Sequence, residues 1–410
     1  MKQKLLIFSQ CFIYGGSERL MQSIYKNKYI LNDFDITLSY SYYKDYELGL
    51  LRDSLNQKIL AKFQPLFLIS NSRVFFKIDK KFRNKTFRRL MKIPLFIIEL
   101  TGIYALWNSF YFIIFLYFLK PNIVHINNGG YPAAEACNQL ALVLIFFPSI
   151  RVIYQVNNMP LIDKNILSRL KDNFIAKSVD IFLTHSKQNQ KALIKRGFKE
   201  SSVVSFPSYF NESIIPTKLT TLKLTDVKFT LCMVGYISYR KGQLFLLKAL
   251  SEIKSRNHPL IKNLHLNIIG DGEDVDIIKK YIDNNQLNEI VTLYGLRFDY
   301  LTFIQECDMY MMTSIENEDL PLVLLSAMEN KKCIIATDFA GISDLLTHNI
   351  DAYLIKPDLK TISNDIADAI IYLYEHPEVR SKLSELVGKT YKENVSEEKY
   401  SYNLISLYKP

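Results

Sequence analysis

Short apolar runs alternate with longer stretches of helical periodicity along the whole chain, and this alternation constrains the fold more than any other feature. One set of apolar runs lies at residues 4–9, 35–40, 122–127, 151–156 and 180–184. A second set lies at residues 228–235, 264–270, 290–294, 308–312 and 333–337. Short continuous runs of this kind are typical of strands that are buried on both faces of a parallel sheet. The sequence therefore predicts an α/β fold with two successive parallel sheets, whose ligands bind at the carboxyl ends of the strands.

The chain is long enough for two domains. Its 410 residues exceed what one ordinary hydrophobic core holds, and the polar, proline-containing segment 211–227 separates the two sets of runs. We predict an N-terminal domain at residues 1–215 and a C-terminal domain at residues 216–395. The last segment, 396–410, is expected to form a helix that packs back on the N-terminal domain.

The composition is that of a folded protein with anionic partners. Hydrophobic residues make up 49% of the chain and charged residues 22%, and the formal net charge is +10. The five cysteines have no CxxC spacing, which favours reduced core thiols in a cytosolic protein over disulfides or a metal site. The apolar run at the N-terminus has no small-residue cleavage site after it, so it is interpreted as a first strand and not as a signal peptide.

The positive charge is concentrated in one segment. Residues 73–92 contain nine basic residues and one acidic residue, Asp79, and the apolar, aromatic segment 93–119 follows directly. Segment 93–119 is interpreted as core helices, as a membrane span, or as a surface that rests on anionic lipid. Pro94 and Glu99 interrupt it, which disfavours the span. A nucleic-acid partner is not expected, because the charge lies beside an apolar block and not in a recognised binding module.

Three motifs could bind an anionic ligand. The first is YGGSERL at 14–20, where Gly16 lets the backbone approach a ligand before a helix begins. The second is the strand-to-helix corner after Gly235, where Arg240 and Lys241 suit a diphosphate. The third is the acidic cluster around Glu318, directly before Leu-Pro and a buried helix. Each motif also has a structural interpretation: a plain turn, two solvated cations, and helix caps, respectively.

Taken together, these motifs resemble the donor site of the family-four retaining glycosyltransferases. The pattern E-x-L-P-L-V-L-L-x-A-M, followed by C-I-I-A-T and A-G-I-x-D at 318–344, resembles the donor-site signature of that family. GGSER, VHIN at 124–127, RKG, IIGDG at 268–272 and VTLYG at 291–295 occur in the family's order. The resemblance implies the GT-B fold, in which two Rossmann-like doubly wound domains face each other across a cleft.

The resemblance also implies roles for individual residues. Lys241 and Arg240 would hold the donor diphosphate, and Glu318 would lie near the transferred sugar. The other residues implied to bind the donor are Gly16, Gly235, Tyr294, Leu296, Arg297, Leu320, Pro321, Leu322, Val323 and Ser326. Those implied on the acceptor side are His125, Asn127, Asn157 and Asn158.

The chain departs from the family pattern at three places. Tyr236 stands where an arginine usually follows the glycine, and Ser326 replaces the second glutamate of the family's E-x7-E motif. A serine hydroxyl makes one hydrogen bond where a carboxylate makes two charge-assisted bonds, so donor binding is expected to weaken by ~1–3 kcal/mol. Asn157-Asn158 stands where relatives often carry His-Asp, so the acceptor pocket is expected to differ.

The resemblance implies a retaining, metal-independent transfer of a sugar from a nucleotide diphosphate, in the first place UDP, to a hydroxyl of a glycan or lipid-linked acceptor in cell-surface polysaccharide synthesis. No cofactor or metal is expected, because Asp274 and Asp276 resemble a DxD motif only in letters. The expected location is cytoplasmic, at the inner face of the membrane and attached through 73–119. Two alternatives stay open: a nucleotide-sugar epimerase of the same fold, and a catalytically silent binding subunit.

Overall fold

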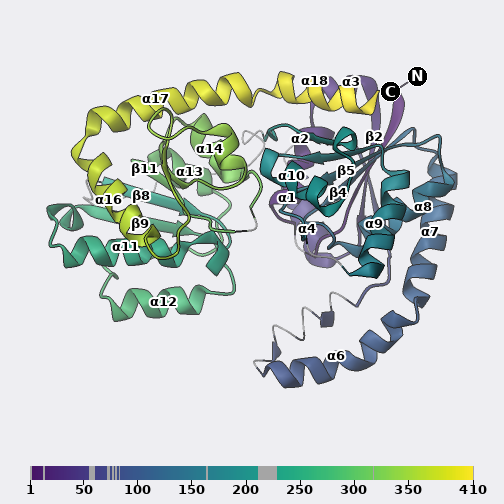
Figure 1. The fold of residues 1–410 in the computed structure, drawn as a ribbon, viewed down its shortest axis with the longest axis horizontal. Coiled ribbons are helices and arrows are strands. Elements are labelled where there is room, and N and C mark those ends of the chain that lie inside the picture. Colours follow the sequence, from purple (N-terminus) through teal and green to yellow (C-terminus); the bar gives the residue numbers. More distant parts are fainter. Residues whose placement is uncertain are drawn as a thin grey trace. The chain divides into compact units, whose positions relative to one another are not determined.

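The chain forms two compact units in the computed structural model (Figure 1). The structure describes residues 2–12, 14–54, 61–71, 74–75, 78, 81–82, 84–162, 165–210, 229–316 and 318–409. The first unit contains Met1–Thr184, Ala192–Val204 and Ser401–Pro410, and the second contains His185–Lys191 and Ser205–Tyr400. The linker expected at 211–227 and the domain boundary expected after residue 215 lie outside the described residues.

The first unit is built on a seven-stranded sheet with the order β3-β2-β1-β4-β5-β6-β7. Its strands are β1 (Gln3–Ser9), β2 (Phe34–Ser41), β3 (Lys62–Leu66), β4 (Ile123–Asn128), β5 (Arg151–Val156), β6 (Ile181–Thr184) and β7 (Val203–Ser205). Neighbouring strands from β3 through β6 run parallel, so their carboxyl ends share one edge of the sheet. Ser9, Asn127 and Asn128 stand at that edge.

Helices lie between these strands in the sequence (Figure 1). They are α1 (Gly16–Leu20), α2 (Gln22–Tyr25), α3 (Lys28–Asp33), α4 (Lys44–Ser54), α6 (Lys85–Leu100), α7 (Ile103–Leu119), α8 (Glu135–Val143), α9 (Ile166–Ser178) and α10 (Lys187–Arg196), with short 3-10 helices η1 (Leu144–Phe146) and η2 (Glu200–Ser202). The C-terminal helix α18 (Glu397–Tyr408) belongs to this unit from Ser401 onward.

The apolar segment 93–119 is divided between α6 and α7, which are separated at Gly102. One stripe of α7 faces the core through Asn108, Phe112 and Leu116, and the Phe112 ring meets the Phe8 ring edge-on at 5.4 Å. Within the described residues no single helix has the length and hydropathy to cross a membrane. Only the pair α6–α7, bent by 55°, reaches that threshold together.

The second unit is built on a six-stranded parallel sheet with the order β10-β9-β8-β11-β12-β13. Its strands are β8 (Phe229–Val234), β9 (Leu264–Ile269), β10 (Val291–Leu293), β11 (Met309–Met312), β12 (Cys333–Thr337) and β13 (Tyr353–Ile355). This strand order is that of a doubly wound Rossmann sheet, in which the order reverses between β8 and β11 and ligands bind at that point.

Helices cover both faces of the second sheet (Figure 1). They are η4 (Tyr239–Lys241), α11 (Gln243–Ser255), η5 (Pro259–Lys262), α12 (Val275–Asn284), α13 (Tyr300–Glu306), α14 (Leu322–Glu329), α15 (Gly341–Leu345), α16 (Ile362–Glu375) and α17 (Pro377–Asn394). Leu231 and Met233 of β8 belong to one apolar cluster, whereas Cys232 and Val234 belong to another. Burial on both faces explains why β8 is a continuous apolar run and not an alternating one.

All the strands that the sequence predicts are present, within one or two residues at each end. Three further strands, β3, β7 and β13, were not predicted. All three are short and lie at sheet edges, and β3 contains Pro65, a residue that sheets tolerate at their edges. The α/β class with two parallel sheets is confirmed.

Close backbone contact shapes the corner between β8 and α11. Gly242 has a φ of 80°, and a Cβ atom at this position would lie 1.9 Å from the carbonyl oxygen of Thr313. A side chain therefore cannot be added without moving the backbone, and the left-handed conformation itself is costly for other residues.

We predict that Gly242→Ala lowers the free energy of unfolding by more than ~2 kcal/mol, since it adds a clash to a strained φ. Urea unfolding followed by circular dichroism measures this loss. Gly129→Ala is the matched control, because a Cβ at Gly129 meets no atom within 4 Å. The control should change stability by less than ~0.5 kcal/mol. Equal stabilities of the two variants would contradict the close contact.

Candidate functional site

Two cations stand where β8 turns into α11. Arg240 and Lys241 lie in η4, and Gly242 precedes α11. The Ile315 N–H donates to the Arg240 carbonyl at 2.8 Å, and the Thr313 hydroxyl donates to the Gly242 carbonyl at 3.1 Å. These bonds hold the corner between β8 and α11 against the segment that follows β11. Side chains of the corner therefore contact side chains of that segment.

Glu318 is the residue that the two cations approach. Its Oε2 atom is ion-paired with Lys241 Nζ, lies 3.5 Å from Arg240 Nη1, and accepts from the Ser314 hydroxyl at 3.3 Å. Glu318 is 6% exposed and the Lys241 side chain is 13% exposed. Removing one partner of such a buried pair leaves an uncompensated charge. The structure thus brings together Lys241, Arg240 and Glu318, the residues that the sequence predicts as catalytic.

Asp319, the next residue, is also a buried carboxylate, but its hydrogen-bond partners differ from those of Glu318. Its Oδ2 atom accepts from the His185 backbone N–H and from Asn189 Nδ2, both at 3.0 Å. Burial raises the pKa of Asp319 to about 6, although these hydrogen bonds oppose the rise. Burial also lowers the pKa of His185 to about 4, so this histidine is neutral at physiological pH. Sequence reasoning treated Asp319 only as part of an acidic cluster.

The residues after Asp319 lead into α14. Pro321 is the N-cap and has no N–H, so the backbone amides available in the first turn are those of Leu322 and Val323. Leu320 is buried before the helix. The Ser326 hydroxyl donates to the Leu322 carbonyl at 3.1 Å inside the helix, which satisfies its proton locally.

The residues expected near the nucleotide base lie after β10. The Tyr294 ring packs edge-on against Phe303, with centroids 4.6 Å apart. Arg297 forms an ion pair with Asp299 at 2.6 Å, and Leu296 is exposed.

Gly235 follows the end of β8 and lies close to Gly270. A Cβ atom on Gly270 would lie 1.9 Å from the Gly235 carbonyl oxygen.

The residues predicted on the acceptor side lie in the first unit, and three of the four, His125, Asn127 and Asn157, belong to one chain of hydrogen bonds. Tyr408 of α18 lies 2.7 Å from His125 Nδ1, and His125 Nε2 lies 3.0 Å from Gln155 Oε1. The Gln155 amide donates to Asn157 Oδ1 at 2.7 Å and to Asn127 Oδ1 at 3.3 Å. The amide oxygen of Gln155 requires a proton on His125 Nε2, so the neutral histidine accepts from Tyr408 through Nδ1. His125 is fully buried, so its side chain orients neighbours and does not reach solvent.

The same chain ends at the glycine loop. Asn127 Nδ2 donates to the Ser9 hydroxyl and to the Ser17 carbonyl, each at 3.2 Å. The Ser9 hydroxyl, the Ser17 hydroxyl and the Gly15 N–H then donate to the Glu18 carboxylate at 3.3, 2.8 and 3.2 Å. Burial raises the pKa of Glu18, and these hydrogen bonds oppose the rise. Glu18 therefore fixes the turn that carries Gly16, where an added Cβ would meet open space. Asn158 donates separately to the Gly129 carbonyl.

Sequence reasoning missed Ser9, Glu18, Gln155 and Tyr408. Glu18 had a detectable signal, because an acid three residues after a helix N-cap is the second half of a capping box. The other three depend on strand register and on a helix from the end of the chain, which the sequence does not display. Within the part of the chain that the structure describes, no group of three or more His, Cys, Asp or Glu side chains is placed to hold a metal ion.

Part of the chain resembles known glycosyltransferases in sequence. Residues 218–389 match the model of the family described as glycosyl transferases group 1. The uncharacterized glycosyltransferase MJ1069 of Methanocaldococcus jannaschii is 26% identical over 223 residues, which are 54% of this chain and 53% of that protein. The alignment thus spans about half the length of this curated relative.

Solved structures extend the likeness to the whole chain. Alr3699/HepE of Anabaena in complex with UDP superimposes with a TM-score of 0.71 at 16% identity and covers 99% of both chains. A glycosyltransferase from Rickettsia africae gives 0.73 at 17% identity and covers 100% of this chain and 98% of the other. At these identities the likeness shows the fold, and the GT-B class expected from the sequence is confirmed.

The raised pKa of Asp319 makes stability depend on pH in a predictable direction. The folded chain holds this proton more tightly than the unfolded chain, whose Asp pKa is near 3.8. The contribution of Asp319 to the free energy of unfolding is therefore largest below about pH 4 and falls until about pH 6. Between about pH 4 and pH 6 the free energy of unfolding of the wild type should fall by up to ~3 kcal/mol relative to that of Asp319→Asn.

Urea unfolding of both proteins between pH 4 and pH 7 measures this difference. The exposed Asp338→Asn controls for the loss of one negative charge. Parallel stability curves for wild type and Asp319→Asn would contradict the burial argument.

Proposed function

We propose that the chain is a retaining glycosyltransferase that moves a sugar from a UDP-sugar to a hydroxyl of a glycan or lipid-linked acceptor, in cell-surface polysaccharide synthesis. The observation that carries this proposal is the convergence of Lys241 and Arg240 on Glu318, beside the first turn of α14. A diphosphate is recognised by cations and by free backbone amides, and this corner offers both.

In the proposed reaction the bond between the sugar C1 atom and the phosphate oxygen breaks, and a bond from the acceptor oxygen to C1 forms on the same face. The acceptor proton passes to the leaving phosphate, so the products are UDP and the glycoside. Lys241, Arg240 and the Leu322 and Val323 amides stabilise the charge that develops on the phosphate, which is electrostatic catalysis. On donor binding, Lys241 would exchange Glu318 for phosphate and leave the carboxylate near the sugar. We assign no protein nucleophile, no cofactor and no metal.

UDP is the proposed nucleotide because Anabaena HepE, which has the same fold, is solved with UDP and with UDP-glucose. UDP at a free concentration of 100 times its Kd should raise the free energy of unfolding by ~2.7 kcal/mol. A thermal-shift screen of UDP, GDP and their sugars therefore tests the donor class directly.

We predict that Lys241→Ala lowers kcat/KM for UDP release from the best donor of that screen by about 100-fold, since it removes a charge-assisted bond to the leaving group. Glu318→Gln should also slow release, because it removes the carboxylate beside the sugar. Lys248→Ala, an exposed cation on α11, is the matched control and should leave the rate unchanged. EDTA should not change the wild-type rate.

Three outcomes separate this proposal from its alternatives. An unchanged rate in Glu318→Gln would remove the catalytic assignment of that residue. Conversion of the donor to a second UDP-sugar without an acceptor would identify an epimerase. Donor binding without turnover would identify a binding subunit, an outcome to which Tyr236 and the inward-bonded Ser326 hydroxyl point.

We further propose that α6 and α7 rest on an anionic membrane surface at the cytoplasmic face. Helix α6 carries Lys85, Arg88, Arg89 and Lys92 together with exposed apolar side chains such as Phe96. Helix α7 adds exposed aromatic side chains along the stripe opposite its core contacts. An exposed apolar surface beside basic residues suits the boundary between lipid headgroups and acyl chains.

We predict that Arg88→Ala/Arg89→Ala weakens binding to phosphatidylserine-containing liposomes by about 2 kcal/mol, roughly 30-fold at low salt. Cosedimentation measures the binding. Lys279→Ala/Lys280→Ala on α12 makes the same charge change on an exposed helix of the second unit and should leave binding unchanged. Wild-type protein that ignores these liposomes at low salt would overturn the membrane proposal.

A further inference from the structure

A cavity with both polar and apolar lining residues lies in the first unit, apart from the hydrogen-bond chain that contains His125. Its volume is about 120 Å³, and α7, α8 and the segments after β1 and β3 enclose it. Whole ligand sites usually measure ~300–1,000 Å³, so this space suits one ring of a larger ligand. Its polar lining residues are Gln10, Ser70, Tyr104, Asn108, Glu135 and Gln139.

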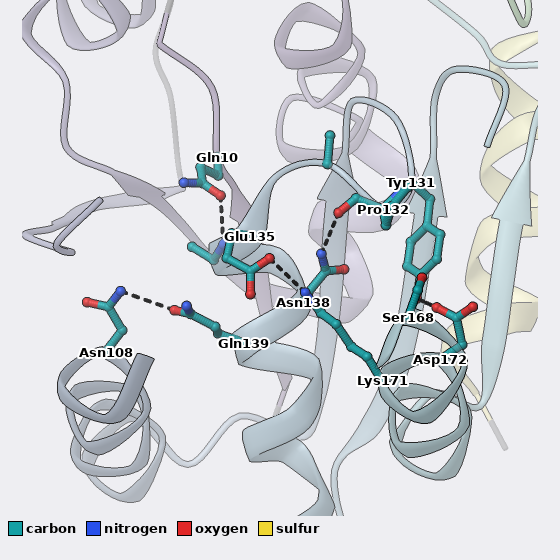
Figure 2. A network of polar contacts seen from close by, with 12 residues as sticks. Gln10, Asn108, Tyr131, Pro132, Glu135, Asn138, Gln139, Ser168, Lys171 and Asp172 are labelled. Carbon is teal, nitrogen blue, oxygen red and sulfur yellow. Dashed lines mark hydrogen bonds and ion pairs between the residues drawn. The ribbon is translucent and has the colours of Figure 1, made fainter. Parts of the chain in front are cut away.

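Hydrogen bonds hold the amide side chains of this cavity in fixed orientations, as Figure 2 shows for Gln10, Asn108 and Gln139. Gln10 Oε1 accepts from the Ala136 N–H at 2.7 Å. Asn108 bonds to both backbone groups of Ile69 at 2.9 Å and donates to Gln139 Oε1 at 3.1 Å. The oxygen ends of both glutamines are therefore occupied by protein donors.

Both glutamines line the cavity, and their nitrogen ends are the donors that they can offer to a ligand there. Gln139 is 7% exposed, and among the described residues neither its Nε2 atom nor that of Gln10 has a protein partner. Glu135 lines the same cavity and is ion-paired at 2.7 Å with Lys171 (Figure 2). Amide donors beside a carboxylate acceptor match hydroxyl groups, which donate and accept at once. The carboxylate disfavours phosphate or another anion.

The wall of the cavity continues into an apolar surface. Tyr104 and Ala105 of α7 line the cavity, and the next residues, Leu106 and Trp107, are 72% and 54% exposed. A ligand with its polar end in the cavity would therefore extend any apolar part along α7, on the surface that we propose to rest on lipid.

We propose that this cavity is a subsite for one neutral, hydroxylated sugar ring of a lipid-linked acceptor, whose lipid part follows α7. The inference rests on the proposed function for its biological meaning, but it concerns binding in the first unit alone. Gln10 and Gln139 donate to the sugar hydroxyls, and Glu135 accepts from them.

The test uses octyl glucoside below its critical micelle concentration as the probe, with Trp107, the only tryptophan of the chain, as the fluorescent reporter. Octyl phosphocholine, which has the same tail and no sugar, is the ligand control. We expect saturable blue-shifted fluorescence with the glucoside. Ala105→Phe, which fills the cavity, and Gln139→Leu, which removes one donor, should each weaken this binding about tenfold.

Leu106→Phe is the matched protein control, because it enlarges the neighbouring exposed side chain and leaves the cavity open. It should leave the glucoside affinity unchanged, and circular dichroism should report wild-type folding for all three variants. Equal affinities for the two surfactants, unaffected by Ala105→Phe and Gln139→Leu, would overturn the subsite and leave only a general apolar surface. UDP thermal shifts in the same variants are a separate readout: if they are absent in wild type, the proposed function fails, whatever the glucoside titration gives.

Discussion

The contact between the backbone at Gly242 and the carbonyl of Thr313 is the constraint on which the candidate donor site depends. It brings η4 onto the end of β11, and the Ile315 N–H then bonds to the Arg240 carbonyl. Only with the corner in this position does Lys241 reach Glu318, 77 residues further along the chain. Two adjacent cations repel each other, and the buried carboxylate of Glu318 between them offsets that repulsion.

The sequence predicts the central strands well, because double burial makes each of them an uninterrupted apolar run. It fails at β3, β7 and β13, where an edge strand buries little and needs no such run. The candidate donor site was predictable for a different reason, the order of its motifs. Lys241 and Glu318 lie in short motifs whose order along the chain resembles a known pattern. Asp319 was overlooked as a separate group because its environment comes from His185 and Asn189, more than a hundred residues earlier.

The first unit shows more clearly what a sequence does not display. Asn127 pairs with Gln155 across β4 and β5, and this register decides which amides meet. Tyr408 reaches His125 only because α18 returns to this unit. In the resulting chain each group donates toward the next, from Tyr408 to Glu18. The chain ends there because a carboxylate can only accept hydrogen bonds. Local motifs reveal Gly16 and His125 separately, but the connection between them is a property of the fold.

The two units differ in the chemistry that they present at their strand ends. In the second unit the polar groups are the cations Arg240 and Lys241, which are paired with the Glu318 carboxylate, and the helix amides of α14. The cations and amides match the charge of a diphosphate. In the first unit they are amides and hydroxyls, with Glu18 and Glu135 as the acids. Neutral sugar hydroxyls are read by paired donors and acceptors, and extra cations there would attract phosphate instead. The transfer reaction that we propose would use this difference, because its donor is charged where bonds break and its acceptor is neutral where they form. The basic residues of α6 belong to neither set, and in the membrane contact that we propose they would face the anionic bilayer.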